Sequence, residues 1–462
     1  MNTRTRTKIL PAVLFAAFAA GNAAASGYHF GTQSVSTQGT ANSSAAEAAD
    51  AATIFYNPAG LAYLERNEIS VSANLVAPSI RYSGAYAAHY RNGRPVSGSS
   101  SGKITDDITV APHVYGAYRL NSRVSLGLGV SVPFGSSTEY DKSSVLRHNI
   151  NKLGLKTVAV EPVIALKAGE KHAFAAGLAA QYSQAQLRKF ADWSAGMSPA
   201  APHTGSLLDG YADVKGHDWG FGYHLAWMYQ PTDRLRIGLN YRSKVSHTLK
   251  GSAKWQAEGL LARANFQGIS APVVLGGRGY AASEKASVAI NTPESLSLHG
   301  MYKATPRLNL FGDITWTRHS RFKRADLVFE QPKRIIGGGL SNTTTITPNW
   351  RNTVKAAVGG SYQISEPWQL RAGIAFDQSP VRNSASRMNT LPDGNRLWFS
   401  AGVRYTPNPA HTFDIAYTHV HINGSDFASP RATGTDVDSK GAATARFKNY
   451  ANILGAQYTY KF

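Results

Sequence analysis

Few groups of side chains in this sequence have the types and spacing of a catalytic or metal-binding site. Gly98–Gly102 matches the G-x-S-x-G pattern of a serine nucleophile, but it lies in a Ser/Gly-rich stretch without the strand and helix that this motif needs. His419 and His421 would share one face of a strand, yet a zinc site requires further ligands. Asp436 and Asp438 belong to a stretch too short for a calcium loop. We therefore expect no catalysis, no metal and no cofactor.

The most distinctive stretch is Ala45–Leu64, which is rich in small residues. Its Ala-rich opening favours a helix. Asn57-Pro58-Ala59-Gly60 predicts the end of that helix in a tight turn, because proline disfavours helical backbone in the residue before it and glycine permits positive φ. Small residues allow such a segment to pack inside a narrow space. The stretch therefore predicts a plug, here called the hatch, inside a barrel.

The N-terminal residues 1–25 have the organisation of a secretory signal peptide. Three basic residues precede the apolar Ile9–Ala20, and a small-residue cleavage site ends at Ala25. We expect the exported chain to consist of the hatch, residues 26–66, followed by a barrel over residues 67–462.

Composition restricts the partners of an exported chain. Cysteine is absent, so no disulfide framework holds the fold. The net charge is +20, which suggests anionic ligands or phosphate-bearing lipid surfaces such as outer-membrane lipid and lipopolysaccharide. Export and the lack of a compact basic motif argue against a nucleic-acid partner. After the signal peptide, no run approaches the roughly 18 apolar residues of a membrane-spanning helix.

From Glu68 onward the dominant hydrophobic period is two. About fourteen segments come near the 9–11 residues that a tilted membrane strand requires, and an even number suits a closed single-chain barrel. These segments are Val71–Val76, Thr109–Arg119, Val124–Val132, Lys156–Lys167, Ala173–Leu187, Trp219–Tyr229, Leu235–Val245, Pro293–Tyr302, Leu308–Trp316, Thr353–Gln363, Gln369–Asp377, Arg396–Tyr405, Thr412–His421 and Tyr450–Phe462.

The connections between these segments alternate between short and long. The short ones, such as Gly169–Lys171 and Pro231–Asp233, consist of turn-forming residues. The long ones are Arg81–Thr105, Gly135–Leu155, Arg188–Asp218, Thr248–Asn291, Thr317–Asn349, Gln378–Asn395 and Asn423–Lys448. Short turns on one side and long loops on the other are typical of an outer-membrane barrel. This alternation favours a membrane barrel over a soluble β-sandwich, in which the aromatic residues would be ordinary core.

Several stretches resemble the FadL/TodX family of outer-membrane transporters. Gly27–Leu61 is similar to the family's hatch, with Asn57-Pro58-Ala59 as its motif. Further similar stretches are Val132–Gly135 with Thr138–Tyr140, Thr292–Ser295, Trp368–Val381 and Leu391–Tyr405. The C-terminal Phe462 resembles the terminal signal that the barrel-assembly machinery reads.

The resemblance implies a monomeric, fourteen-stranded barrel in which ligand leaves sideways at a kinked third strand. That strand is Val124–Val132, and Gly127, Gly129 and Pro133 mark a place where strand pairing is weak. Alternatively, these glycines only relieve crowding against the hatch.

The hatch itself is implied to gate transport. Asn57, Pro58 and Ala59 would form the gate, and Phe55 and Tyr56 would line the internal pocket. The alternative is a static plug whose motif only fixes the path of the chain.

Two long loops, Arg188–Asp218 and Thr248–Asn291, are implied to capture ligand. They contain apolar residues that a water-exposed loop does not need, which usually indicates binding. We single out Phe190, Trp193, Leu207, Leu208, Trp255, Leu260 and Phe266. A lid in which the loops pack on each other would also explain these residues.

A dehydrated carboxylate needs a charged or hydrogen-bonding partner. The candidates on position along the strands are Arg242, Arg318, Lys355 and Arg371, each of which could instead be a paired charge of the lumen. We expect a passive transporter of long-chain fatty acids or similar hydrophobic molecules. The alternatives are uptake of aromatic hydrocarbons, a surface adhesin with long basic loops, and an outer-membrane lipase, for which we find no Ser/His pair.

Overall fold

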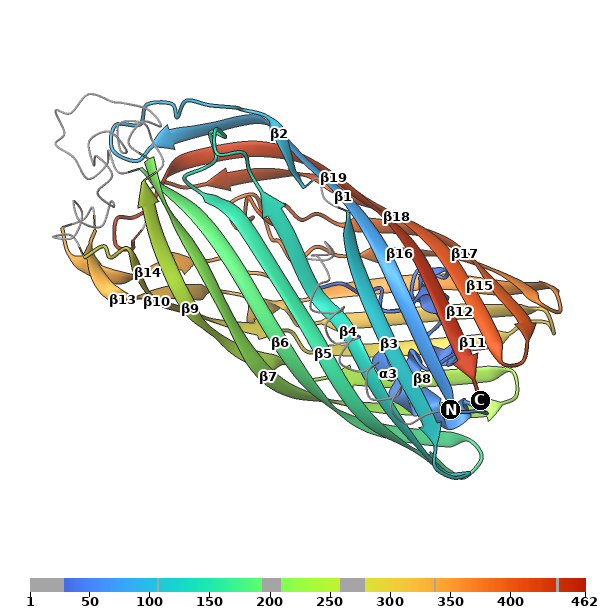
Figure 1. Cartoon of the computed structure of the whole chain (residues 1–462). Helices are drawn as coiled ribbons and strands as arrows, with labels where there is room; N and C mark the ends of the chain where they lie inside the picture. The colour runs from blue at the N-terminus through green and yellow to red at the C-terminus, as the bar shows by residue number, and fades with distance from the viewer. Residues whose placement is uncertain (1–28, 106–107, 193–208, 258–278, 336–337, 438–439) are drawn as a thin grey trace.

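The first and last strands pair with each other, so the sheet has no free edge. In the computed structural model, β1 (Glu68–His89) runs antiparallel to β19 (Lys440–Lys461), with Glu68 opposite Lys461. The structure describes residues 29–105, 108–192, 209–257, 279–335, 338–437 and 440–462. Within these residues the chain forms a long antiparallel barrel (Figure 1), because closure leaves no backbone group of an edge strand unpaired.

The remaining strands follow in sequence around the barrel. They are β2 (Gly102–Thr105), β3 (Thr109–Arg119), β4 (Val124–Glu139), β5 (Ile150–Ala168), β6 (His172–Asp192), β7 (Asp209–Thr232), β8 (Leu235–Arg242), β9 (Val245–Ala257), β10 (Ser283–Thr292), β11 (Ser295–Lys303), β12 (Leu308–Thr317), β13 (Ala325–Arg334), β14 (Leu340–Ile346), β15 (Thr353–Ser365), β16 (Trp368–Asp377), β17 (Arg396–Asn408) and β18 (His411–Ser429).

These segments make fourteen crossings, which confirms the predicted barrel. The short β2 belongs to an outer loop, and four crossings are each divided in two, as β8–β9, β10–β11, β12–β13 and β14–β15. The short predicted turns and the C-terminal end of β19 lie together at one end of the barrel (Figure 1). We call this end the inner end, and the opposite one the mouth.

Several strands run further toward the mouth than predicted. The predicted loop Arg188–Asp218 was wrong over all of the residues described there, because β6 continues to Asp192 and β7 begins at Asp209. The predicted loop Thr248–Asn291 was wrong over most of the residues described there, because β9 continues to Ala257 and β10 begins at Ser283. Likewise, the predicted loop Thr317–Asn349 contains β13, β14 and a short 3-10 helix (His319–Arg321). These extensions lie beyond the apolar belt, and most of their outward side chains are polar, with exceptions such as Val328 and Leu340, so they lack the apolar outer face that predicts a membrane strand.

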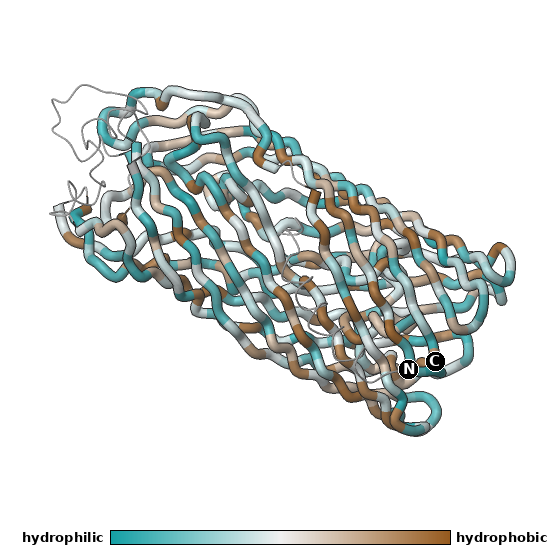
Figure 2. The backbone as a smooth tube through the Cα atoms, viewed as in Figure 1, coloured by the Kyte–Doolittle hydropathy of each residue, from teal (hydrophilic) through white to brown (hydrophobic). Residues whose placement is uncertain are grey.

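The apolar belt is clear on β7. Its outward residues Trp219, Phe221, Tyr223 and Leu225 are exposed, whereas the inward His224 is buried. Figure 2 shows hydrophobic residues alternating with polar ones along the strands, and hydrophilic residues in the turns of the inner end. Such alternation is what lipid outside and a polar lumen inside require. None of the described helices has the length and hydrophobicity to cross a membrane.

The hatch lies inside the inner half of the barrel and consists of short pieces. They are α2 (Val35–Gln38), the 3-10 helix η1 (Ala45–Glu47), α3 (Thr53–Tyr56) and the 3-10 helix η2 (Pro58–Tyr63). The helix ends before Asn57 as predicted. It begins only at Thr53, since Ala48 has left-handed backbone (φ 50°), so the continuous helix expected from Ala45 was wrong.

Glycines in the wall give the hatch backbone room to approach. A Cβ atom on Gly373 would lie 2.3 Å from the carbonyl carbon and oxygen of Thr40. A Cβ on Gly402 would lie 3.0 Å from the Cα of Gly39. Polar contacts then fix the hatch: Gln38 Nε2 donates to the carbonyl of Ile453 (3.0 Å). The hatch is therefore held against the wall by close backbone contact as well as by side chains.

Gly373→Ala tests this contact. Because backbone atoms of Thr40 cannot rotate away, we expect the hatch to be destabilised by about 1–3 kcal/mol, the usual cost of overpacking. Hydrogen exchange at the hatch amides of the folded protein in detergent measures the change. Gly312→Ala is the control, since nothing lies within 4 Å of its added Cβ. Equal exchange in the two variants would contradict the close contact.

Candidate functional site

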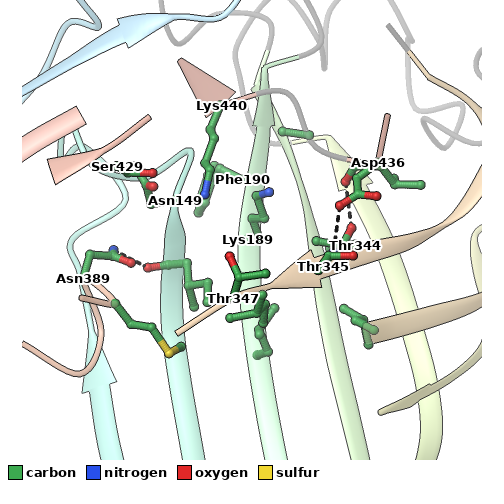
Figure 3. A pocket seen from close by; sticks show the side chains of 18 of the residues that line it. Asn149, Lys189, Phe190, Thr344, Thr345, Thr347, Asn389, Ser429, Asp436 and Lys440 are labelled. Atoms are coloured by element: carbon green, nitrogen blue, oxygen red, sulfur yellow. Dashed lines mark hydrogen bonds between the residues drawn. The ribbon is translucent and has the colours of Figure 1, made fainter. Parts of the chain in front are cut away.

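A cavity of about 220 Å³ lies among the outer ends of the strands at the mouth. Phe190 and Trp255, two of the predicted capture residues, line it. Both side chains are largely buried, at 1% and 6% exposure. Figure 3 shows polar side chains around this mouth cavity, among them Asn149, Thr345 and Lys440. The mouth cavity thus combines an apolar wall with a polar, partly cationic lining.

A buried polar cluster fixes Trp255 in this wall. Its indole N–H donates to Glu284 (2.7 Å), which also pairs with Lys333 (2.6 Å). The Lys333 ammonium group lies against the rings of Trp255, Tyr280 and Phe329. Because every charge in this cluster has a partner, the Trp255 ring is held rigidly on the cavity wall.

The mouth cavity leads into a second, almost wholly apolar cavity of about 110 Å³. The two share the lining residues Leu187, Val214, Leu327, Ile346 and Met388, so they adjoin each other. Further down the wall of this apolar cavity lie Leu155, Leu249 and Leu391. A hydrophobic molecule that enters at the mouth therefore meets apolar side chains as it moves inward.

A third cavity, of about 90 Å³, borders the hatch and is polar. Phe55 and Tyr56 of α3 line it, as the sequence predicts. Two of the four predicted basic residues, Arg242 and Lys355, line it too. His29 contributes from the N-terminal end of the hatch, although no sequence signal singles it out. This hatch cavity gathers two cations, together with the carboxylates of Asp313 and Asp377, next to hatch aromatics.

The four predicted basic residues differ in their partners. Arg371 is buried and pairs with Glu47 of the hatch (2.7 Å). Arg318 pairs with Glu294 (3.0 Å) and is 46% exposed.

Arg242 pairs with Glu161, donates to the carbonyl of Phe55 (2.8 Å), and lies over the Phe55 ring. Lys355 forms no ion pair with another described residue. Its ammonium group lies 4.8 Å from the centre of the Trp398 ring. Lys355 is thus the predicted cation of the hatch cavity that forms no direct ion pair within the described chain, although the carboxylates of Asp313 and Asp377 also line this cavity.

Asn57 connects the hatch to the barrel wall. Its side-chain N–H group lies 3.2 Å from the carbonyls of Trp227 and Leu239, and 2.8 Å from His299 Nε2. Its side-chain oxygen accepts from the Ala59 N–H (3.0 Å) and so starts the next turn, in which Pro58 is the first residue. One buried side chain therefore fixes both the local turn and its place on the wall.

The pairing of β4 breaks where the resemblance predicts a weak point. β4 keeps β5 as its partner as far as Glu139, but it keeps β3 only as far as Val130. Beyond Val130 the hatch supplies the hydrogen bonds: the Phe30 N–H donates to the Pro133 carbonyl (2.8 Å), and Gln33 bonds to both backbone groups of Val132. This break lies between the second and third crossings.

Gly127 and Gly129 lie below this break, where β4 is still paired with β3. A Cβ on Gly127 would lie 2.8 Å from Ile54 and from Leu61, and one on Gly129 would lie 3.0 Å from Ile54. At their own positions these glycines make room for the hatch, which was the alternative explanation for them. Pro133 is the residue of this group that lies in the break itself.

The remaining predicted capture residues Trp193, Leu207, Leu208, Leu260 and Phe266 lie outside the described residues. Two of the motifs weighed in the sequence have ordinary contacts: His419 Nδ1 is bonded to Asn452 (2.9 Å), and Asp436 accepts from the Thr345 N–H (3.1 Å, Figure 3).

Comparison with known proteins gives a match over almost the whole chain. Residues 16–462 match the family described as outer membrane protein transport protein (OMPP1/FadL/TodX). The chain belongs to this family. An outer membrane protein of Neisseria meningitidis serogroup B is 59% identical over 97% of each chain. The long-chain fatty acid transport protein of Salmonella typhi is 26% identical over 80% of this chain and 82% of its own.

Solved FadL-family structures share the fold. A Pseudomonas aeruginosa FadL homologue superposes with a TM-score of 0.82 at 23% identity, covering 94% of this chain and 99% of that one. The Ralstonia pickettii toluene transporter TbuX gives 0.62 at 19% identity, covering 93% and 98%. The protein is therefore an outer-membrane β-barrel of the FadL family, a non-enzymatic family that transports hydrophobic compounds.

Arg371→Gln and Arg318→Gln should separate a hatch anchor from a rim charge. Removing Arg371 leaves the Glu47 carboxylate without its buried partner, which we expect to cost about 3–5 kcal/mol. Arg318 is half-exposed, and Glu294 keeps Arg321 as a second partner. Removing Arg318 should therefore lower the free energy of unfolding by about 1 kcal/mol or less. Equilibrium unfolding of the two variants in detergent measures both. Equal losses would show that Glu47 does not anchor the hatch.

Proposed function

We propose that the protein takes up long-chain fatty acids, or similar hydrophobic molecules with an anionic head group. The observation that supports this most is the set of cavities within the barrel: the mouth cavity, the apolar cavity that adjoins it, and the hatch cavity lined by Lys355 and Arg242. Capture would begin at Phe190 and Trp255, and Phe55 and Tyr56 would contact the bound ligand. Transport would need no energy source, because the ligand moves inward if each site binds it more tightly than the site before.

The free energies of burying an apolar chain and a carboxylate are consistent with an amphipathic ligand. Each methylene that moves from water into the apolar cavity contributes about 0.8 kcal/mol. The carboxylate loses its hydration there, and that loss must be offset by a cation or by hydrogen bonds. Lys355 is the natural partner, because Glu161 already neutralises Arg242.

The relatives support two substrate classes. The relative from Salmonella typhi is a long-chain fatty acid transport protein, whereas TbuX is a toluene transporter. Uptake of aromatic hydrocarbons is therefore the alternative. A hydrocarbon has no charge to balance, so Lys355, which forms no direct ion pair in the described chain, favours the fatty acid even though Asp313 and Asp377 line the same cavity.

Lys355→Gln tests the substrate class. We expect oleate to bind the purified variant at least about tenfold more weakly, because a hydrogen bond to a charged group contributes about 1.5–3 kcal/mol. Toluene binding should not change. Titration in detergent measures the affinities, and uptake of labelled oleate by cells without their own transporter tests transport.

Lys303→Gln is the matched control, because Lys303 is exposed at the inner end of β11. Equal oleate affinity in both variants would exclude Lys355 as the carboxylate partner. If the properly inserted wild type takes up toluene but not oleate, the substrate is a hydrocarbon and not a fatty acid.

We also propose that the hatch gates transport at Asn57. A ligand in the hatch cavity contacts Phe55 and Tyr56, which directly precede Asn57. A shift of this turn would break the bonds of Asn57 to the wall and weaken the ligand site. Release would then proceed sideways at the break beside Pro133, where the hatch replaces β3 as the partner of β4.

Asn57→Ala combined with Pro58→Ala tests the gate. The variant loses the wall contacts of Asn57, so we expect oleate uptake to fall several-fold while the level of protein in the outer membrane stays normal. Ala62→Ser, also in the hatch, is the control for substitution alone. Normal oleate uptake by the double variant would be compatible with transport but would contradict gating at Asn57.

Lipid partners are proposed from a group of exposed lysines. Ser252 on β9 has Lys215 opposite it on β7 and Lys285 opposite it on β10. Lys250 and Lys254 flank it on the same outward face. Four ammonium groups directly above the apolar belt suit the phosphates of lipopolysaccharide.

At the inner end of the barrel, we propose that the barrel-assembly machinery recognises Phe462. We also propose that the protein acts as a monomer.

A further inference from the structure

A group of histidines and a carboxylate is buried at the mouth, apart from the ligand path. His89 ends β1, Asp192 ends β6, and His148 lies in the connection between β4 and β5. Their exposures are 1%, 2% and 2%. One possible ligand atom from each of the three lies within 4.8 Å of the other two. We call these residues the outer His/Asp cluster.

Hydrogen bonds orient the His148 ring. Its Nε2 lies 2.9 Å from Asp209 Oδ1, and Asp209 is held in turn by Arg147 Nε at 2.6 Å. Because the carboxylate can only accept, Nε2 carries the proton, and Nδ1 therefore presents a lone pair. Nδ1 is buried and has no hydrogen-bond partner among the described residues.

The other members of the cluster lie beside the His148 ring. The rings of His89 and His148 are 5.6 Å apart between their centres. His89 Nδ1 is 2.7 Å from Asp192 Oδ2, so an imidazole and a carboxylate already touch beside the His148 ring. Two imidazoles and one carboxylate, with a fourth position for water, form a ligand set that Zn²⁺ prefers and that Ca²⁺ and Mg²⁺ do not.

We propose that the outer His/Asp cluster binds a zinc ion, with His89, His148 and Asp192 as ligands and Asp209 as the group that orients His148. Zinc–ligand bonds of about 2.0–2.2 Å place tetrahedral ligands about 3.4 Å apart, so small rotations of these side chains bring them into range. A carboxylate that holds the second nitrogen of a ligating histidine is a common feature of zinc sites, and the Asp209–His148 contact has this arrangement.

Zinc at this site would join three segments around the mouth cavity. Asn149, next to His148, and Phe190, close to Asp192, both line that cavity. The ion would therefore fix the position of the cavity wall without touching the ligand. This inference is independent of the transported substrate, since it rests on residues outside the apolar path.

Direct metal binding tests the proposal. The full-length exported protein is purified from outer membranes in detergent without a polyhistidine tag, stripped with a chelator and titrated calorimetrically with ZnCl₂. We expect one zinc ion per chain, which mass spectrometry of the desalted protein should also find. A Co²⁺-substituted sample should show the visible absorption of a tetrahedral nitrogen/oxygen site.

His148→Gln is the decisive variant, because the amide can still donate to Asp209 while the imidazole ligand is lost. We expect its zinc affinity to fall by at least about 10–100-fold, the loss that removal of an orienting partner alone produces. His217→Gln, which changes an exposed histidine on the outer face of β7, should bind zinc as the wild type does.

Heat-modifiable migration in unheated gels identifies variants that fold. If His148→Gln does not fold, His89→Gln replaces it with the same expected loss. Substoichiometric zinc in the wild type, or equal affinity in the wild type and a folded His148→Gln protein, would overturn the proposal.

Discussion

The structure depends on one constraint: every backbone N–H and C=O that faces lipid must have a hydrogen-bond partner within the protein. Pairing of β1 with β19 satisfies it for the sheet as a whole. The same constraint operates where β3 stops pairing with β4. There the hatch, through Phe30 and Gln33, supplies the missing bonds to Val132 and Pro133. A weak point in the wall is therefore compatible with the membrane only because the plug completes it.

The lumen has two different halves. In the inner half the hatch is polar, and its charges are paired with the wall, as Glu47 is with Arg371 and Asp50 with Arg404. Wall glycines such as Gly373 let backbone meet backbone there. Above the hatch the wall is lined by leucine, valine and methionine, and it encloses the apolar cavity. The rigid, polar half thus ends where the path for a hydrophobic ligand begins.

The sequence predicts what depends on local pattern. Alternation such as Trp219, Phe221 and Tyr223 on one face of β7 is sufficient to find the crossings. It fails for the outer part of β9, where the outward side chains, such as Lys250 and Lys254, are polar and the apolar Leu249 and Trp255 point inward. Phe190 and Trp255 could be found because they are apolar residues in otherwise polar stretches. The choice of Lys355 among four cations could not be made, since Glu47, Glu161 and Glu294, which bind the other three, come from distant segments. The outer His/Asp cluster was invisible for the same reason.

The hatch bonds to strands on all sides of the barrel, and this has a consequence for assembly. Gln38 bonds to the last strand, Asn57 to carbonyls of β7 and β8, and Phe30 to β4. An open sheet that still lacks its closing pair cannot offer all of these partners at their final distances. We therefore expect docking of the hatch and closure of the barrel to be coupled, with the N-terminal segment acting as a template around which the first and last strands meet.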